Sequence, residues 1–267
     1  MAHAAEAEPP LDSLLNFRDV GKFVNQHSQK RSEHLQQINK MRTASMPSAA
    51  PLTPSNPQTT VPLKIPGISY VSINLNGPAY SFSLIRQLPY RSTLRLATLM
   101  TFGYRTDAIS ILGKNVMTPR GLSGLAIDTL THSTSEFLSI FRLLSNPLAY
   151  PVLVHCTQGK DRTGLTVLLV LLLLKIPMPV IEADYKLSQR ELLPEREDKI
   201  REVRSIGLPD SFADCPDDWV STVTTWIEET YGSVEAYLKG IGVGEEMQES
   251  IRAALLEPEG ANIDPTA

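Results

Sequence analysis

One ten-residue segment, His155–Gly164, constrains the fold of this 267-residue chain more than any other feature. It lies between two apolar runs, Pro151–Val154 before it and Leu165–Leu174 after it. A short apolar run, a tight polar loop and a longer apolar run are typical of a buried strand, a loop and a buried helix. The sequence therefore predicts a loop wrapped at the N-terminus of a helix.

This loop, with the sequence HCTQGKDRTG, contains the groups that bind and attack a phosphate. Backbone N–H groups at a helix N-terminus, together with the helix dipole, favour an anion. A helix N-terminus and neighbouring cations also lower the pKa of a thiol such as Cys156 below its ordinary value of about 8.5. Arg162 supplies a planar fork that matches two phosphate oxygens. We therefore predict cysteine-based hydrolysis of a phosphate ester, which requires a nucleophile, an anion cradle and a clamp.

Two other interpretations of the loop fail on spacing. A nucleotide-binding loop ends in Gly-Lys-Ser or Gly-Lys-Thr, whereas Gly159 and Lys160 are followed by Asp161. A cysteine protease needs a histidine that is distant in sequence and folds onto the cysteine, but His155 is the immediate neighbour of Cys156. The remaining alternative is a buried and inert cysteine, since a bare Cys-x5-Arg pattern arises by chance.

The loop sequence resembles the signature of the atypical cysteine-dependent tyrosine and lipid phosphatases, a family known from secreted bacterial virulence enzymes and fungal relatives. Three flanking motifs agree with the resemblance by their order: Asn16–Asp19 (NFRD), Asp184-Tyr185 with Ser188, and elements within 231–243. The similarity covers residues 14–24 and most of 64–256. It implies an α/β fold with a central, mostly parallel sheet flanked by helices. It also implies activity on phosphotyrosine, on phosphoserine or phosphothreonine, and on phosphoinositides.

The loop residues can be given roles. We expect Cys156 to attack phosphorus and Arg162, with the loop amides, to stabilise the equatorial oxygens. The other predicted substrate-binding positions are Thr157, Gln158, Gly159, Lys160 and Thr163. The Thr163 hydroxyl would hydrogen-bond the sulfur, and His155 would support the backbone around the cysteine. Lys160, a second cation, suits either a multiply phosphorylated head group or tighter binding of a single phosphate.

The sequence offers two interpretations of the residue that would protonate the leaving oxygen. The chain contains no Trp-Pro-Asp, the motif that carries the acid in many tyrosine phosphatases. The resemblance implies that Asp161 is the catalytic acid. Its neighbours Lys160 and Arg162 stabilise the ionised carboxylate, which opposes proton donation. A carboxylate that bridges these cations and holds the loop is the alternative.

Composition limits the partners and the compartment. A net charge of −4 gives no overall attraction to nucleic acid or to an anionic membrane. A nucleophilic Cys156 has to stay a free thiol, so we expect a reducing, cytoplasmic setting. The second cysteine, Cys215, lies in the acidic turn Asp214–Asp218, which should raise its pKa. We interpret it as a structural thiol, with a resolving partner for oxidised Cys156 as the alternative.

One phosphatase domain is expected over 14–256, with a Pro-rich flexible linker at 43–66. Residues 1–13 and 257–267 are predicted to be disordered, and the N-terminus has no apolar core typical of a signal peptide. The run Leu165–Leu174 is too short for a membrane span, which needs about 20 residues. We expect a monomer that acts on a phosphorylated protein or phosphoinositide, without nucleic acid, metal or cofactor.

Apolar spacing predicts the secondary structure elsewhere. Alternation over 68–75 predicts a strand. Spacing at three and four predicts helices over 80–113, 121–145, 182–204, 217–232, 233–240 and 244–256. Ser133 or Ser135, followed by Glu136, suggests a capped helix start.

The chain departs from the family after NFRD. The resemblance implies a strand that ends in Asp-Leu-Arg, and this stretch is missing here. Three explanations are open: the fold closes with fewer strands and residues 25–60 become irregular, an exon is missing from the gene model, or the chain is a natural variant of poor stability. Loss of a central strand exposes backbone and apolar edges. An inactive or binding-only pseudophosphatase is therefore the alternative function.

Overall fold

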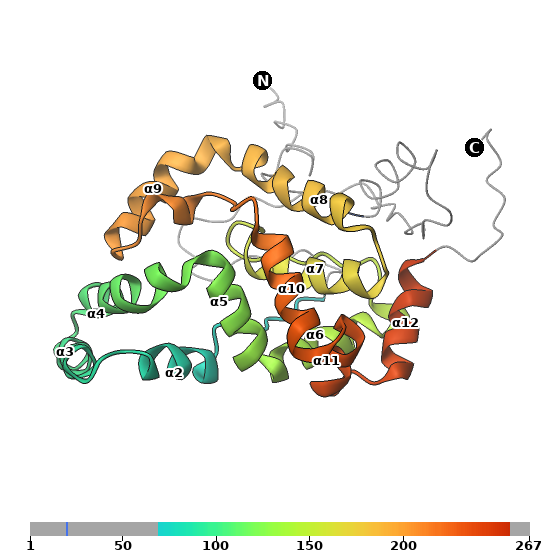
Figure 1. Cartoon of the computed structure of the whole chain (residues 1–267), viewed down its shortest axis with the longest axis horizontal. Helices are drawn as coiled ribbons and strands as arrows, with labels where there is room; N and C mark the ends of the chain where they lie inside the picture. Colours follow the sequence, from blue (N-terminus) through green and yellow to red (C-terminus); the bar gives the residue numbers. More distant parts are fainter. Residues whose placement is uncertain (1–19, 21–68, 257–267) are drawn as a thin grey trace, which may run out of the picture.

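The computed structural model describes Val20 and residues 69–256, and this part of the chain is built from helices joined by short connections (Figure 1). The α-helices are α2 (Pro78–Arg86), α3 (Tyr90–Thr101), α4 (Arg105–Leu112), α5 (Thr118–His132), α6 (Thr134–Leu144), α7 (Arg162–Leu173), α8 (Met178–Glu191), α9 (Arg196–Ser205), α10 (Trp219–Tyr231), α11 (Val234–Gly240) and α12 (Glu245–Leu255). A π-helical turn, Gly113–Met117, joins α4 to α5. Short 3-10 segments are Pro147–Ala149, Leu193–Glu195 and Asp210–Ala213.

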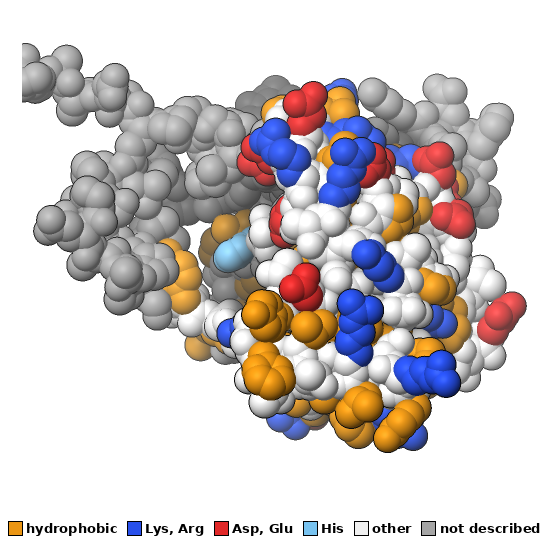
Figure 2. Space-filling model, turned by 90° about the vertical axis from the view of Figure 1, so that its left-hand side faces the viewer, with side chains coloured by type: hydrophobic (Ala, Val, Ile, Leu, Met, Phe, Trp, Pro, Cys, Tyr) orange, Lys and Arg blue, Asp and Glu red, His pale blue; other side chains and the backbone are white. Residues whose placement is uncertain are grey.

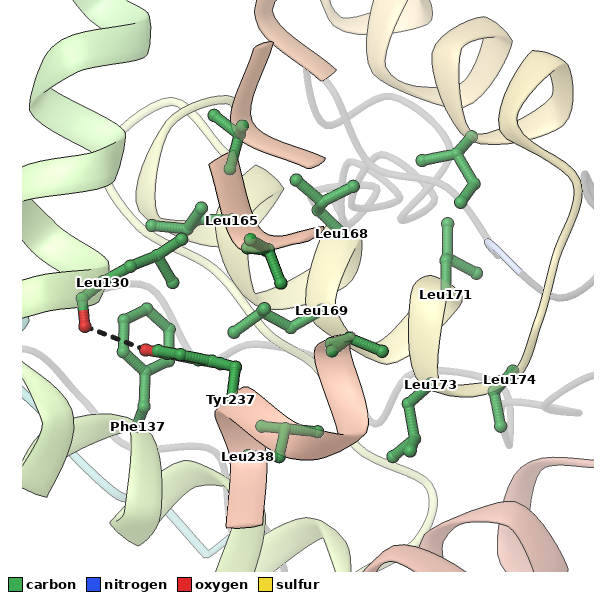
Figure 3. Close-up of a cluster of buried hydrophobic side chains, with 14 of the residues drawn as sticks. Leu130, Phe137, Leu165, Leu168, Leu169, Leu171, Leu173, Leu174, Tyr237 and Leu238 are labelled. Carbon is green, nitrogen blue, oxygen red and sulfur yellow. Dashed lines mark hydrogen bonds between the residues drawn. The ribbon is translucent and has the colours of Figure 1, made fainter. Parts of the chain in front are cut away.

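Helix α7 lies in the main hydrophobic core. Its leucines are buried on several sides of the helix, as its nearly continuous apolar sequence predicts. Figure 3 shows side chains from α5, α6 and α11 packed around them, including Leu130, Phe137 and Tyr237. The Tyr237 hydroxyl donates a hydrogen bond of 2.9 Å to the Leu130 carbonyl, so a buried polar atom is satisfied. This packing fixes α7, and with it the loop that precedes it.

A second, smaller core holds helices α2, α3 and α4, which we call the arm, against α5 and the segment after α9. Its buried members include Tyr80, Leu84, Leu96, Ile111, Leu208 and Phe212. A Cβ atom on Gly113 would lie 2.4 Å from the carbonyl oxygen of Ile206. Only glycine therefore allows the end of α4 to approach the end of α9 so closely. In Figure 1 the arm lies at the opposite end of the molecule from α12.

The predicted central parallel sheet is wrong for the described residues. No β-strand forms within 69–256. The run Pro151–Val154 leads into the loop without a paired strand, and Leu153 is 59% exposed. The predicted strand at 68–75 is also absent from its described part, where Val71 is 60% exposed. A strand requires a neighbour to pair its backbone N–H and C=O groups, and apolar alternation alone does not supply one.

The helical predictions are largely confirmed. The three helices of the arm correspond to the predicted range 80–113, and α5 and α6 correspond to 121–145. Helices α10, α11 and α12 correspond to the predicted ranges 217–232, 233–240 and 244–256. The helix predicted over 182–204 is interrupted at Leu193–Glu195, since Pro194 has no N–H to continue the ladder.

The predicted start of α6 differs in one respect. Ser133 occupies the N-cap position, but its side chain does not cap the helix. Its hydroxyl instead donates a hydrogen bond of 2.6 Å to the carbonyl of Leu75. The serine therefore fastens the segment before the arm to the start of α6.

Several predictions lie outside the described residues. These are the disordered termini at 1–13 and 257–267, the NFRD motif, the irregular stretch at 25–60 and the Pro-rich linker at 43–66. The single domain over 14–256 stays a prediction. Within the part of the chain that the structure describes, no helix combines the length and the apolar character needed to cross a bilayer.

Candidate active site

The signature loop directly precedes α7, as the sequence predicted. Asp161 occupies the N-cap position, and its carbonyl accepts the hydrogen bond of the Leu165 N–H at 2.8 Å. Gly159 has a φ of +71°, in the left-handed region that favours glycine. The glycine therefore permits the sharp turn that directs the chain into the helix.

The environment of Cys156 favours its thiolate. Burial by itself raises the pKa of this half-buried thiol. The hydroxyl and backbone N–H of Thr163 and the backbone N–H groups of Gln158 and Gly159 donate toward the sulfur and outweigh burial, so the pKa is lowered. Donors that converge on a thiolate stabilise its charge. Cys156 is thus more readily ionised than an ordinary cysteine.

The Thr163 hydroxyl is available to the sulfur. It is buried and has no well-oriented hydrogen bond to another group among the described residues. Because a hydroxyl proton rotates about the C–O bond, it can turn toward a neighbouring thiolate. Among the hydrogen bonds that lower the Cys156 pKa, this side chain makes the largest contribution.

Arg162 begins α7 and retains most of its donors. One guanidinium nitrogen, Nη2, donates to the Thr157 hydroxyl at 3.1 Å. The guanidinium forms no ion pair with any residue that the structure describes. A guanidinium has five N–H donors, so several are free for an anion. We call Cys156, Thr157, Arg162 and Thr163 the front of the loop.

The Lys160 side chain points away from the front of the loop. Its side chain is fully buried, and its ammonium donates to the carbonyls of Phe212 at 3.2 Å and Asp214 at 3.0 Å. It also lies 3.2 Å from the Asp161 carboxylate. Two of its three N–H donors are therefore bound to protein carbonyls, its third contact is an ion pair, and the buried ammonium is turned toward these groups instead of a substrate. We call Lys160, Asp161 and the segment Phe212–Cys215 the rear of the loop.

One carboxylate oxygen of Asp161 contacts the rear of the loop. Its Oδ1 is the oxygen beside the Lys160 ammonium, while the side chain as a whole is 44% exposed. Within the described residues the carboxylate has no ion pair with Arg162. The predicted bridge between two cations is thus a contact with Lys160 alone.

Asp214 anchors the rear segment. Its carboxylate accepts two hydrogen bonds from Arg196, at 2.7 and 2.9 Å, and one of 3.0 Å from Gln189. The same glutamine accepts the backbone N–H of Cys215 at 2.6 Å. These bonds from Arg196, ahead of a lowering effect of Lys160, hold the pKa of Asp214 below its usual range. The rear of the loop is therefore fastened to α8 and α9.

Cys215 belongs to the rear. Burial raises the pKa of its thiol, and Asp161 and Asp214 add to that effect. The predicted direction is confirmed, although burial rather than the acidic turn is the main cause. Its neighbour Tyr185 stacks on Trp219 with ring centroids 4.5 Å apart, and the same ring packs against Gly164. Cys215 thus lies in a packed, poorly ionised environment.

Two further predicted site residues, His155 and Gln158, lie on either side of Cys156 in the loop. His155 is exposed, and its Nδ1 lies 3.3 Å from the Cys156 carbonyl, a distance suited to a hydrogen bond when that nitrogen carries a proton. This position agrees with support of the backbone around the cysteine. Gln158 is half-buried and contributes its backbone N–H to the sulfur.

The sequence reasoning missed three polar residues near the loop. Asp128 on α5 is buried and accepts two hydrogen bonds from Arg120, at 2.6 and 2.9 Å. The hydroxyl of Tyr80 on α2 lies close to this pair and within electrostatic reach of Arg162. Burial, reinforced by Asp128, raises the pKa of Tyr80 to about 12. No local pattern marks these residues, because α2, α5 and α7 meet only in the folded chain.

Comparison with known proteins supplies the family. Residues 100–257, more than half of the chain, match the model of the tyrosine phosphatase family. This chain belongs to that family.

Two curated proteins are similar to parts of it. A tyrosine-protein phosphatase of Nostoc commune is 29% identical over 146 residues, which cover 51% of this chain and 50% of that protein. The triple specificity protein phosphatase PtpB of Mycobacterium tuberculosis is 31% identical over 122 residues, covering 40% and 44% respectively. The chain thus matches about half the length of these relatives or less.

Proposed function

We propose that this member of the tyrosine phosphatase family hydrolyses phosphate monoesters through a phosphocysteine intermediate. The observation that carries the proposal is the lowered pKa of Cys156, produced by donors of its own loop. An ionised sulfur at a helix N-terminus, beside a guanidinium with free donors, is arranged for attack on a bound phosphate.

The proposed reaction has two steps. The Cys156 thiolate forms a bond to phosphorus, and the bond from phosphorus to the substrate oxygen breaks. The leaving oxygen takes a proton, and the phosphoryl group stays on sulfur. Water then attacks phosphorus, the P–S bond breaks, and inorganic phosphate and the thiolate are released. Arg162 and the loop amides stabilise the equatorial oxygens in both steps, and the Thr163 hydroxyl stabilises the departing thiolate.

Asp161 is the proposed proton donor, because it is part of the loop and about half exposed. A proton donor has to carry its proton when the substrate is bound, and a phosphate dianion beside a carboxyl group promotes protonation. Asp161→Asn tests this role. Loss of an acid should slow an alkyl phosphate far more than p-nitrophenyl phosphate, whose leaving group needs no proton. Equal losses on both substrates, with an unchanged basic limb of the pH profile, would assign Asp161 to positioning the loop.

Phosphotyrosine is the proposed principal substrate, with phosphoserine or phosphothreonine and phosphoinositides as further ones. The family name supports the first, and the printed name of the mycobacterial relative supports a broader range. Lys160 gives no support to a multiply phosphorylated head group, since its donors are engaged at the rear. A comparison of kcat/KM for a phosphotyrosine peptide, a phosphoserine peptide and phosphatidylinositol phosphates decides the order.

A binding-only pseudophosphatase is the second candidate, favoured by the absence of strands in the described residues and by the exposed Leu153. Hydrolysis of p-nitrophenyl phosphate by the full chain separates the two. Turnover that disappears in Cys156→Ser supports the enzyme. A folded protein that binds phosphate without Cys156-dependent turnover supports the pseudophosphatase.

We further propose a monomer that works in the reducing cytoplasm. Both Cys156 and Cys215 are free thiols, and the proposed chemistry requires the first of them reduced. The proposed steps use only side chains, backbone amides and water.

A further inference from the structure

The arm carries an outward surface that the proposed reaction does not use. Seven of its large apolar side chains are well exposed: Phe82, Tyr90, Leu94, Met100, Phe102, Tyr104 and Ile109. Their exposed fractions reach 81% at Tyr90 and 73% at Phe102. Exposed apolar side chains that gather on a surface in this way mark a site that binds a membrane or another protein.

The same surface is positively charged. Helices α2 to α4 contain four arginines, Arg86, Arg91, Arg95 and Arg105, against one acidic residue, Asp107. All four arginines are exposed, and none forms an ion pair with a residue that the structure describes. The arm thus has a net positive charge of its own, in a chain whose net charge is −4.

The two kinds of side chain share one face of α3. Only Leu96 of this helix is buried, and at 3.6 residues per turn Tyr90, Arg91 and Leu94 project from the opposite side. Phe102, Tyr104 and Arg105 continue the surface through the corner between α3 and α4. Figure 2 looks onto this end of the molecule and shows hydrophobic and basic side chains mixed over its lower part, while most acidic ones lie higher.

Helix α9 provides an internal contrast. Its four cations, Arg196, Lys199, Arg201 and Arg204, each contact a carboxylate. The charges on this helix are balanced by neighbouring carboxylates and need no further partner. The arm instead presents unpaired guanidinium groups beside aromatic and aliphatic side chains, the combination found in helices that lie in the interface of an anionic membrane.

From these observations we propose that the outward face of α3, with the α3–α4 corner, docks on the surface of an anionic lipid bilayer. The apolar side chains enter the head-group region, and the arginines bind lipid phosphates and carboxylates. The proposal concerns binding and does not depend on the proposed hydrolysis.

Co-sedimentation of the full chain with vesicles tests the proposal. The Cys156→Ser variant is incubated with vesicles of phosphatidylcholine, or of phosphatidylcholine containing phosphatidylserine. We expect sedimentation with the anionic vesicles alone, and weaker sedimentation at high salt. Arg91→Gln with Arg95→Gln should lower the partition coefficient by about tenfold or more, since each basic residue at such a surface contributes about 1 kcal/mol. Leu94→Ser with Phe102→Ser should lower it similarly.

The matched control removes two positive charges elsewhere. Arg190 and Arg201 are exposed and paired on α8 and α9, so Arg190→Gln with Arg201→Gln should leave sedimentation unchanged. Circular dichroism confirms that each variant is folded. Equal sedimentation of the arm and control variants, or the same binding to neutral vesicles, overturns the proposal. Light scattering that shows a dimer lost in Leu94→Ser with Phe102→Ser overturns it in favour of a second copy of this chain.

Discussion

The front of the signature loop and the loop residues of its rear lie within the eight residues Cys156–Thr163, yet their polar groups differ in one respect. At the rear, the buried Lys160 ammonium donates to two backbone carbonyls and forms an ion pair with Asp161. At the front, the Arg162 guanidinium donates to the Thr157 hydroxyl and forms no ion pair with a described residue, while the Thr163 hydroxyl is directed at the Cys156 sulfur. A polar group whose donors are bound to the protein holds the structure, whereas a polar group with spare donors can bind a ligand. The residue types alone do not show which side chain is structural and which is available to a ligand.

The two cysteines give the strongest test of this difference. Cys156→Ser should reduce kcat on p-nitrophenyl phosphate by at least about a thousandfold, because a neutral hydroxyl replaces the ionised nucleophile. Cys215→Ser at the rear should leave kcat nearly unchanged. Steady-state kinetics on the two purified variants measures both. A comparable loss in each would place the rear cysteine in the reaction.

The two arginines sharpen the comparison. Arg162→Lys should lower kcat/KM by about a hundredfold to a thousandfold, since the ammonium keeps the charge but loses the fork that stabilises the transition state. Arg196→Lys is the matched change at the rear and should have little effect on kinetics. An Arg162→Lys variant that retains wild-type kcat/KM would mean that the front does not clamp phosphate.

Lys160→Met should act on stability rather than on substrate affinity. Two carbonyls and the Asp161 carboxylate lose their donor, so the free energy of unfolding should fall by about 2–4 kcal/mol. Urea unfolding measures this, and KM for an aryl phosphate should change little. Lys186→Met serves as the control, because its side chain is half exposed. Unchanged stability with a strongly raised KM would show that Lys160 binds the substrate.

Thr163→Val should have the smallest effect, and one that depends on pH. The hydroxyl helps to lower the pKa of Cys156, so its loss should leave the effect of burial less opposed and raise that pKa relative to the unchanged chain. The rate of alkylation by iodoacetamide should therefore fall most at low pH and recover at high pH, where both thiols are ionised. Thr163→Ser, which keeps the hydroxyl, should retain the original profile. A parallel loss at every pH would point to a change in access instead of ionisation.

Sequence reasoning succeeded where the interactions are local. The helices of the arm and of the C-terminal part follow from apolar spacing, because a helix makes its hydrogen bonds within four residues. The lowered pKa of Cys156 was likewise predictable, since its donors Gln158, Gly159 and Thr163 are near neighbours in the chain. Membership of the tyrosine phosphatase family rests on residues 100–257, which include this loop.

The sequence-based predictions failed where an interaction joins residues that are distant in the sequence. The sheet was expected from two apolar segments, but strands exist only when other segments pair with them. Ser133 was expected to cap its own helix, and its hydroxyl instead binds Leu75, 58 residues earlier. Tyr80, Asp128 and Arg120 gave no sequence signal, because the packing of α2 on α5 brings them to the loop.

The sequence by itself determined that a cysteine, a polar loop with a glycine and an arginine occur together at the start of a buried helix. The tertiary structure alone decided which loop residues face outward. Lys160 turns to the rear because its acceptors, Phe212 and Asp214, lie 52 and 54 residues further along the chain. A side chain with several donors follows the acceptors that the fold places nearby, and no local pattern records where they are.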